Sequence, residues 1–285
     1  MAISRMQIED PNYWRGINPD CCISENPWPQ NVDEIAFSEA EIEKIRLSIA
    51  EEGYFLTPCC ITDAQLEKLL SCTSRVMAKG HAPAYALLYD DFFEVLASLG
   101  NLLRAILGVD YMIVPDEPDV YFIPTSDTHA GAEPHRDTLH YAGMYDSAGL
   151  PAVINVWIPL TDATTLNSCM HVIPAWADPD YATTRSDETL SSPMDPSFLQ
   201  RARALPAKAG SVLGWSTELI HWGGQSSSKA ELPRLSFAMY FQRGHETKVH
   251  PTATRPPLNL DFDYRLYLVE KVWRDPHGRE LQKYI

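Results

Sequence analysis

The sequence predicts an α+β protein, mainly β, in which an N-terminal helical layer packs on a β-sandwich or jelly roll. Helical patterns fall in the first 110 residues, and short β-like runs between turn-rich segments follow them. The chain also has 22 prolines against 14 glycines, which favours many short elements over long helices.

Two N-terminal helices have clear start signals. Ser38 and Glu41 form the pattern of a capping box, and the helix that they open is stopped by Gly53. Thr62 and Gln65 repeat the capping pattern at the start of a second helix, which also ends at a glycine. Each helix places its apolar residues on one face, so both are expected to pack against the core.

The remaining elements follow in order along the chain. The first thirty-odd residues are rich in Pro, Asn and Trp and predict an irregular arm, and a third helix is expected over residues 92–107. The C-terminal tail is expected to dock as a helix. The long polar stretch Trp176–Leu205 predicts a loop of a length that is often functional or disordered, and we expect it to cover the site. The expected strands are Val120–Ile123, Leu139–Tyr141, Ala152–Ile158, Met170–Ile173, Ser211–Trp215 and Leu235–Phe241.

A length of 285 residues suits a single domain with a core of useful size. The expected division is an N-terminal arm and helices over residues 1–110, a β core over 111–245, and a C-terminal extension over 246–285.

Composition excludes several classes of protein. The formal net charge of −15 disfavours binding to nucleic acid or to anionic membranes. The six cysteines contain no Cys-x-x-Cys spacing, so neither a zinc ribbon nor a disulfide framework is expected. The N-terminus lacks the apolar segment of a signal peptide, and the most apolar stretch is broken by charges. We therefore expect a cytoplasmic protein with a small-molecule substrate, and a homodimer is compatible with the sequence.

The motif His135-Arg136-Asp137 is the first candidate for chemistry. On a strand, His135 and Asp137 point the same way and offer two adjacent ligands to a divalent metal. His221, 84 residues after Asp137, is the candidate third ligand. Two histidines and one carboxylate on one face are typical of oxygen-activating non-haem Fe(II). A lone His-x-Asp is a weak signal, because a surface histidine and a capping aspartate would produce it equally.

Arg234 and Ser236 add a second signal, because they share one face of a strand. A guanidinium beside a hydroxyl can hold a carboxylate by two points. An arginine in an edge strand with a surface ion pair is the alternative explanation of the same residues.

Taken together, these motifs resemble the phytanoyl-CoA dioxygenase family of Fe(II)/2-oxoglutarate oxygenases. The resemblance extends from about residue 119 to residue 243, and it rests on the order and spacing of several segments. These are His135-x-Asp137, Asn155–Thr164, Asn167–Pro174, Gly210-Ser211-Val212, His221, Arg234 and Ser236.

The resemblance implies a double-stranded β-helix, which is a cupin-like jelly roll. It implies that His135, Asp137 and His221 bind Fe(II), and that Arg234 binds 2-oxoglutarate with Ser236 and Trp157 nearby. It further implies a dioxygenase that uses O2 to oxidise a small-molecule metabolite, with hydroxylation as the default outcome, and releases succinate and CO2. The family's halogenases replace the carboxylate ligand by Gly or Ala, whereas this chain keeps its aspartate, which favours oxygenation.

Two alternatives remain open. A cupin-like metal enzyme that does not use 2-oxoglutarate would leave Arg234 unexplained. A non-catalytic barrel that binds a ligand would not need three metal-binding side chains to converge, and the fold alone does not separate these readings.

Overall fold

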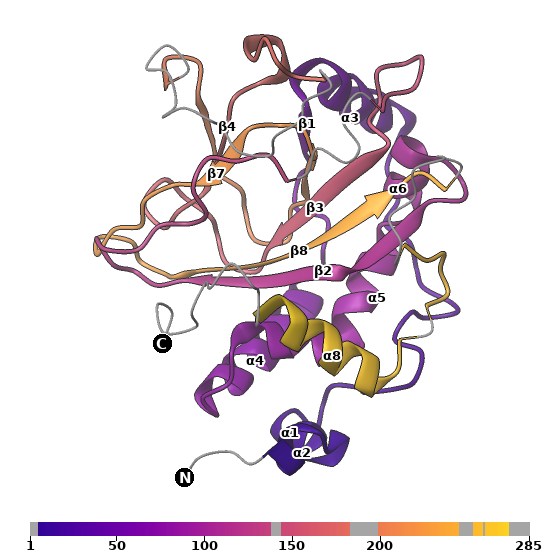
Figure 1. Cartoon of the computed structure of the whole chain (residues 1–285), viewed down its shortest axis with the longest axis vertical. Coiled ribbons are helices and arrows are strands. Elements are labelled where there is room, and N and C mark those ends of the chain that lie inside the picture. The colour runs from indigo at the N-terminus through magenta and orange to yellow at the C-terminus, as the bar shows by residue number, and fades with distance from the viewer. Residues whose placement is uncertain (1–4, 138–143, 183–198, 245–252, 259, 274–285) are drawn as a thin grey trace.

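Two antiparallel sheets and a set of helices make up the protein. The computed structural model describes residues 5–137, 144–182, 199–244, 253–258 and 260–273. Five strands pair in the order β1-β6-β3-β8-β2, and three pair in the order β5-β4-β7 (Figure 1). The strands are β1 (Tyr54–Leu56), β2 (Met112–Ile123), β3 (Val153–Pro159), β4 (Met170–Val172), β5 (Arg203–Leu205), β6 (Leu213–Ser216), β7 (His221–Gly223) and β8 (Arg234–Gln242).

Most helices precede the strands, as the sequence predicts. They are α1 (Arg5–Ile8), α2 (Pro11–Ile17), α3 (Glu39–Glu52), α4 (Asp63–Ala78), the 3-10 helix η1 (Pro83–Leu88), α5 (Asp91–Ser98) and α6 (Gly100–Leu107), followed later by η2 (Ala175–Ala177) and α8 (Phe262–Trp273). Among the described residues, no helix is both long and apolar enough to cross a membrane.

The capping motifs set the helix boundaries as expected. The Ser38 and Thr62 side chains accept from backbone N–H groups in the first turns of α3 and α4, and both capping boxes are complete. Gly53 ends α3 with φ +82°, a left-handed conformation that glycine adopts without strain. The C-terminal helix is also present, as α8.

Two expectations about the helices were wrong. The N-terminal arm is not irregular, because α1 and α2 form there, and the Asp10 side chain caps α2 just before Pro11. The third helix is not continuous, since α5 and α6 are separate helices that meet at Leu99. Most residues of α5 and α6 are buried. The apolar pattern of the sequence therefore continues across Leu99 and does not reveal the break between the two helices. The expected strand Leu139–Tyr141 lies outside the described residues.

Strand β8 shows how the large sheet divides the interior. Phe237, Met239 and Phe241 belong to the main hydrophobic core, which the helices complete. On the opposite face, Ala238 belongs to a second core that includes residues of the small sheet. Figure 1 shows α4, α5 and α8 on the side of the large sheet away from β4 and β7. Alternation along the strand therefore assigns one face to the helices and the other to the space between the sheets.

Candidate metal centre

Two glycines allow the chain to approach itself closely beside β7. A Cβ added at Gly131 would lie 2.4 Å from the Gly223 Cα atom, and one added at Gly223 would lie 2.5 Å from the Gly131 Cα atom. A side chain at either position would push the two backbones apart. The close approach lets the segment that contains His135 pair with β7. His135 and His221 exchange both backbone hydrogen bonds, each at 3.0 Å.

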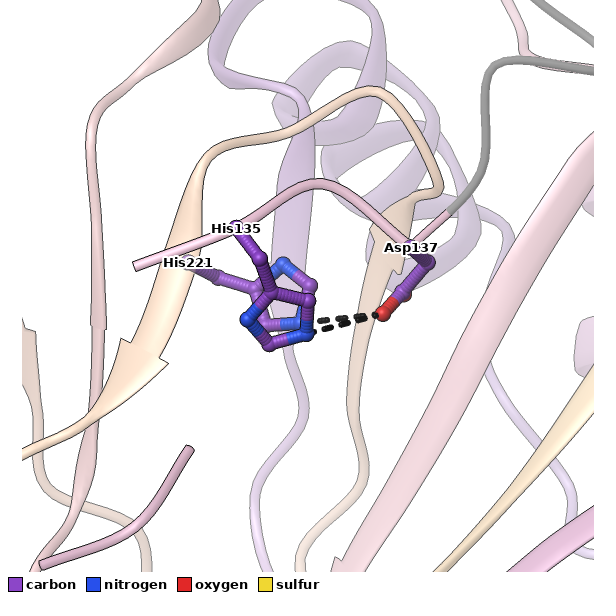
Figure 2. Close-up of side chains that lie close together, drawn as sticks. All are labelled: His135, Asp137 and His221. Atoms are coloured by element: carbon purple, nitrogen blue, oxygen red, sulfur yellow. Dashed lines mark ion pairs between the residues drawn. The ribbon is translucent and has the colours of Figure 1, made fainter. Parts of the chain in front are cut away.

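This pairing brings three ligand-type side chains to one point. The His135, Asp137 and His221 ligand atoms all lie within 4.8 Å of one another, and within the described part of the chain no other group of three such side chains does so. The Asp137 Oδ1 atom lies 3.5 Å from His135 Nε2 and 3.2 Å from His221 Nε2, as Figure 2 shows. The side chains of His221 and Asp137 are buried, whereas that of His135 is 39% exposed, so the centre opens on the His135 side.

Backbone carbonyls fix which nitrogen of each ring faces the carboxylate. His135 Nδ1 lies 2.6 Å from the Glu133 carbonyl oxygen, and His221 Nδ1 lies 2.9 Å from the Leu219 carbonyl oxygen. Because a carbonyl only accepts, each Nδ1 carries a proton and each ring turns its Nε2 atom toward Asp137. Both Nε2 atoms therefore face the same carboxylate oxygen.

The pKa of Asp137 reflects the same arrangement. Burial alone would raise it, but attraction to His221 and His135 outweighs burial and holds the Asp137 pKa well below its usual range. The carboxylate is therefore ionised and available as a metal ligand.

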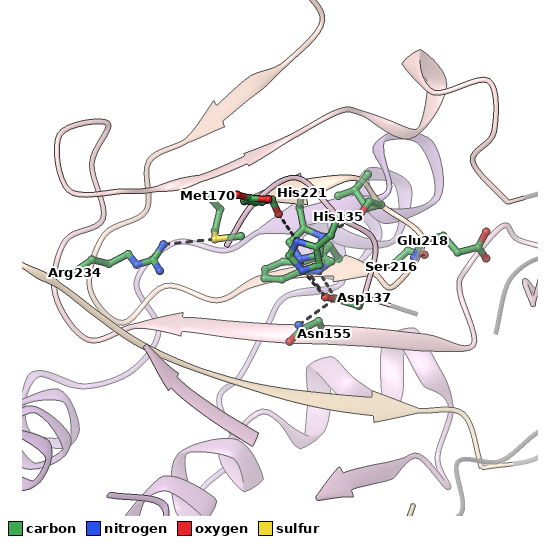
Figure 3. A network of polar contacts seen from close by, with 11 residues as sticks. His135, Asp137, Asn155, Met170, Ser216, Glu218, His221 and Arg234 are labelled. Carbon is green, nitrogen blue, oxygen red and sulfur yellow. Dashed lines mark hydrogen bonds and ion pairs between the residues drawn. The ribbon is translucent and has the colours of Figure 1, made fainter. Parts of the chain in front are cut away.

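Two residues that sequence reasoning missed contact the other carboxylate oxygen. Trp215 Nε1 donates to Asp137 Oδ2 at 2.9 Å, and Asn155 Nδ2 donates to it at 3.2 Å (Figure 3). The sequence gives a signal for Asn155, because it lies two residues before Trp157 and so shares its face of the strand. Trp215 ends the expected strand Ser211–Trp215, and its contact with Asp137 depends on strand pairing that the sequence does not reveal.

Arg234 lies at the other end of the same pocket. Its side chain is buried, donates to the Ser168 carbonyl oxygen, and lies 5.8 Å from the centre of the Trp157 ring. Figure 3 shows Met170 between Arg234 and the three metal-binding candidates, and Arg234, Met170, Trp157 and those candidates all line the pocket.

Ser236 and Trp157 carry buried polar atoms that face no protein partner. Ser236 is fully buried, and its hydroxyl has no hydrogen-bond partner among the described residues. The same holds for Trp157 Nε1. Trp157 lines the pocket, and Ser236 lies two residues after Arg234 in β8, so a polar ligand bound beside Arg234 would give both atoms a partner.

His171 and the charged residue inside the motif lie outside the pocket. His171 stacks on Trp222 at 5.4 Å and does not line the pocket. Arg136 points away from its two neighbours and forms an ion pair with Asp178 at 2.6 Å, with both side chains buried. That ion pair anchors the segment that carries His135 and Asp137.

A centre with two histidines, one carboxylate and an open side is of the type found in non-haem iron oxygenases. A family model described as phytanoyl-CoA dioxygenase (PhyH) matches residues 32–235, well over half of the chain. The chain therefore belongs to the phytanoyl-CoA dioxygenase family, and it is an oxidoreductase that depends on Fe(II) and 2-oxoglutarate and acts on small molecules.

Solved structures share this fold at low sequence identity. The epimerase SnoN in complex with Fe3+, alpha ketoglutarate and nogalamycin RO is 18% identical, with a TM-score of 0.56 over 72% of this chain and 85% of that one. The carbocyclase SnoK from nogalamycin biosynthesis is 15% identical, with a TM-score of 0.55 over 76% and 92%. EctD from S. alaskensis with 2-oxoglutarate and 5-hydroxyectoine is 15% identical, with a TM-score of 0.52 over 76% and 82%. No curated protein matches the sequence.

Proposed function

We propose that His135, Asp137 and His221 bind Fe(II), and that Arg234 holds the far carboxylate of 2-oxoglutarate with Ser236 and Trp157 beside it. The observation that carries this proposal is that three metal-binding candidates and a buried guanidinium line one pocket. His135, Asp137 and His221 would hold the metal that binds one end of the cosubstrate, and Arg234 would bind the other end.

The end of the pocket formed by His135, Asp137 and His221 suits a cation because of its ligand atoms. The Nδ1 contacts turn both imidazole Nε2 atoms toward an ionised carboxylate. The two Nε2 atoms and the carboxylate oxygen would together hold a divalent cation. Imidazole and carboxylate are ligands that suit iron, and three ligands on one side leave positions for other molecules.

The arginine end suits a dicarboxylate. A guanidinium offers two parallel N–H donors to a carboxylate, and a hydroxyl on the same strand face adds a third donor. The unsatisfied Ser236 Oγ and Trp157 Nε1 atoms gain partners when a carboxylate occupies this end. Arg234 thereby also sets the direction in which the cosubstrate reaches the metal.

When bound, iron supplies O2 activation coupled to the decarboxylation of 2-oxoglutarate to succinate and CO2. The chain supplies position and dryness for this chemistry. Trp157, Met170 and Trp215 surround the pocket with apolar surface and exclude water from it. The exposed side of His135 is the side on which a substrate approaches.

We propose a small metabolite as the substrate and hydroxylation as the default outcome. The relatives with solved structures support small molecules in general, since those bound in them are nogalamycin RO and 5-hydroxyectoine. The net charge of −15 favours a neutral or cationic molecule over an anionic one.

We also propose a specific fold type and domain division. The two antiparallel sheets would form a double-stranded β-helix with an N-terminal helical layer, within a single oxygenase domain. That domain would divide into residues 1–110, 111–245 and 246–285. A cytoplasmic location fits the composition, and a homodimer remains compatible with it.

The test uses purified protein without oxygen. Fe(II) and 2-oxoglutarate together should produce the visible charge-transfer band of a chelated 2-oxo acid, and admitting O2 should release succinate. Arg234→Ala should lose the band at cosubstrate concentrations that saturate the wild type. A cupin-like enzyme would bind the metal without the band, and a ligand-binding barrel would show neither. Either result would overturn the cosubstrate assignment.

A further inference from the structure

The two oxygens of Asp137 have different surroundings. Oδ1 faces the Nε2 atoms of both histidines, and Oδ2 faces away from them and accepts two hydrogen bonds. The donors are an indole N–H at 2.9 Å and an amide N–H at 3.2 Å. The carboxylate is therefore held so that one oxygen points to the metal centre and the other is bound by the protein.

The two donors form a rigid unit. Asn155 in β3 and Trp215 in β6 are direct partners across antiparallel strands, so their side chains leave the same face of the sheet side by side. Both residues are buried, and Trp215 also packs its ring against His221 at 4.7 Å between ring centres. The backbone N–H of Asp137 donates to the carbonyl oxygen of Thr217, the residue directly after β6. One short stretch of chain thus positions the aspartate by its backbone and by its side chain.

Asn155 is an unfavourable residue for strand β3 unless it has this role. Every residue of β3 is buried, and its neighbours Ile154 and Val156 belong to the main core. The Asn155 Oδ1 atom is buried without a hydrogen-bond partner among the described residues, which lowers stability. An aliphatic residue would suit the strand better. The Nδ2 contact with Asp137 explains why an amide stands here.

We propose that Asn155 and Trp215 are positioning residues that make Asp137 bind the metal through Oδ1 alone. This inference rests on the proposed function, since it assumes that Asp137 is a ligand. A carboxylate can chelate a metal through both oxygens, and doing so would fill a position that the cosubstrate or O2 needs. Two donors on Oδ2 oppose that rotation. They also fix the carboxylate plane in which Oδ1 meets the two imidazoles.

The test measures metal binding directly, with Co(II) as the probe. Trp215→Phe keeps the ring that packs on His221 and removes only the N–H donor, and Asn155→Leu keeps the volume and removes the amide. Each should weaken Co(II) binding by roughly 10- to 100-fold, as loss of partners that orient a ligand does elsewhere. The visible absorption bands of bound Co(II) should also change, since they report the number and geometry of its ligands.

Asn155→Asp separates positioning from packing. It matches asparagine in shape but places a carboxylate beside Oδ2, so it should weaken Co(II) binding more than Asn155→Leu does. A structural role predicts the reverse order, with the isosteric change the milder one. The matched control is Trp222→Phe, because Trp222 lies in the next strand, stacks on His171 and does not line the pocket. It should bind Co(II) as the wild type does. If Trp215→Phe does not fold, Asn155→Leu carries the test.

The Asp137→Ala variant distinguishes an error in this inference from an error in the proposed function. If Asp137→Ala binds Co(II) as tightly as the wild type, the metal site itself is wrong. If Asp137→Ala loses Co(II) while Asn155→Leu and Trp215→Phe keep wild-type affinity and absorption bands, the triad stands and the positioning role is refuted. Loss of affinity in folded variants, with changed bands, supports the role.

Discussion

Arg234→Ala is the substitution that most directly tests the cosubstrate site. Arg234 is 2% exposed, so its guanidinium meets a carboxylate away from bulk water. Losing such a charge-assisted pair costs about 2–5 kcal/mol, which corresponds to roughly 30- to several-thousand-fold in affinity. The Michaelis constant for 2-oxoglutarate should therefore rise by at least roughly tenfold in a succinate-release assay, even if a neighbouring donor compensates for part of the loss.

Two comparisons make this result specific. Arg234→Lys should fall between the wild type and Arg234→Ala, because lysine keeps the charge but lacks the planar pair of donors. Arg255→Ala is the matched control, since the Arg255 side chain is 57% exposed and pairs with Asp110 at the surface. Such a pair contributes little, and the saturation curve should not move.

Iron binding should not change in the Arg234→Ala variant. Arg234 is not among the three metal-binding candidates, so the Arg234→Ala variant should retain wild-type iron occupancy. Turnover that needs no 2-oxoglutarate, or an unmoved saturation curve for Arg234→Ala, would remove the cosubstrate assignment and leave only the metal site.

Three shorter predictions concern the metal centre. The protein purified without oxygen should bind about one Fe(II) per chain. His135→Ala or Asp137→Ala should lose iron and turnover, because two protein ligands hold iron poorly. Full iron content of either variant by metal analysis would contradict this. Asp137→Gly should lose hydroxylation and gain azide or chloride binding at the iron, seen by absorption spectroscopy, because two N–H donors then face the space that the carboxylate leaves. Gly223→Ala should weaken Co(II) binding, since its Cβ meets backbone of Gly131 at 2.5 Å, whereas Gly16→Ala, with nothing within 4 Å, should not.

The sequence predicted those parts of the fold that depend on local signals. The capping box at Ser38, the glycine at position 53 and the second box at Thr62 define their helices through contacts within a few residues, so no knowledge of the rest of the chain is needed. The same reasoning could have found α2, because Asp10 before Pro11 is also a start signal. Composition hides this helix, because Pro and Asn are also typical of irregular segments.

The metal centre was predictable in its residue types and not in its supporting contacts. The two-residue spacing of His135 and Asp137 predicts one face of a strand. In the structure this segment is not a strand, and the backbone contacts of His135 with His221 and of Asp137 with Thr217 place the two side chains together. The role of Trp215 depends instead on the register between β3 and β6, which is a contact between residues 60 apart in the sequence. Local patterns do not encode such a register. Residues 183–198 of the expected loop lie outside the described residues, and its last three residues form strand β5, so its functional role stays a prediction.

Adjacent residues of strand β8 should affect different properties: Phe237 the stability of the fold, and Ser236 the binding of the cosubstrate. Phe237 is fully buried in the main core and packs edge-on against Phe92 at 5.2 Å between ring centres. Phe237→Ala should cost about 3–5 kcal/mol of unfolding free energy, measured by chemical denaturation, because it leaves a cavity. Where the variant is folded, its Michaelis constant for 2-oxoglutarate should stay near that of the wild type.

Ser236→Ala should do the opposite. Its hydroxyl is buried without a partner among the described residues, so removing it should leave stability unchanged or slightly higher. A hydrogen bond to a carboxylate contributes about 1.5–3 kcal/mol, and the Michaelis constant for 2-oxoglutarate should accordingly rise by roughly 10- to 100-fold. If Ser236→Ala instead destabilised the fold and left cosubstrate saturation unchanged, the hydroxyl would serve packing. The pocket-facing side of β8 would then bind the cosubstrate through Arg234 alone.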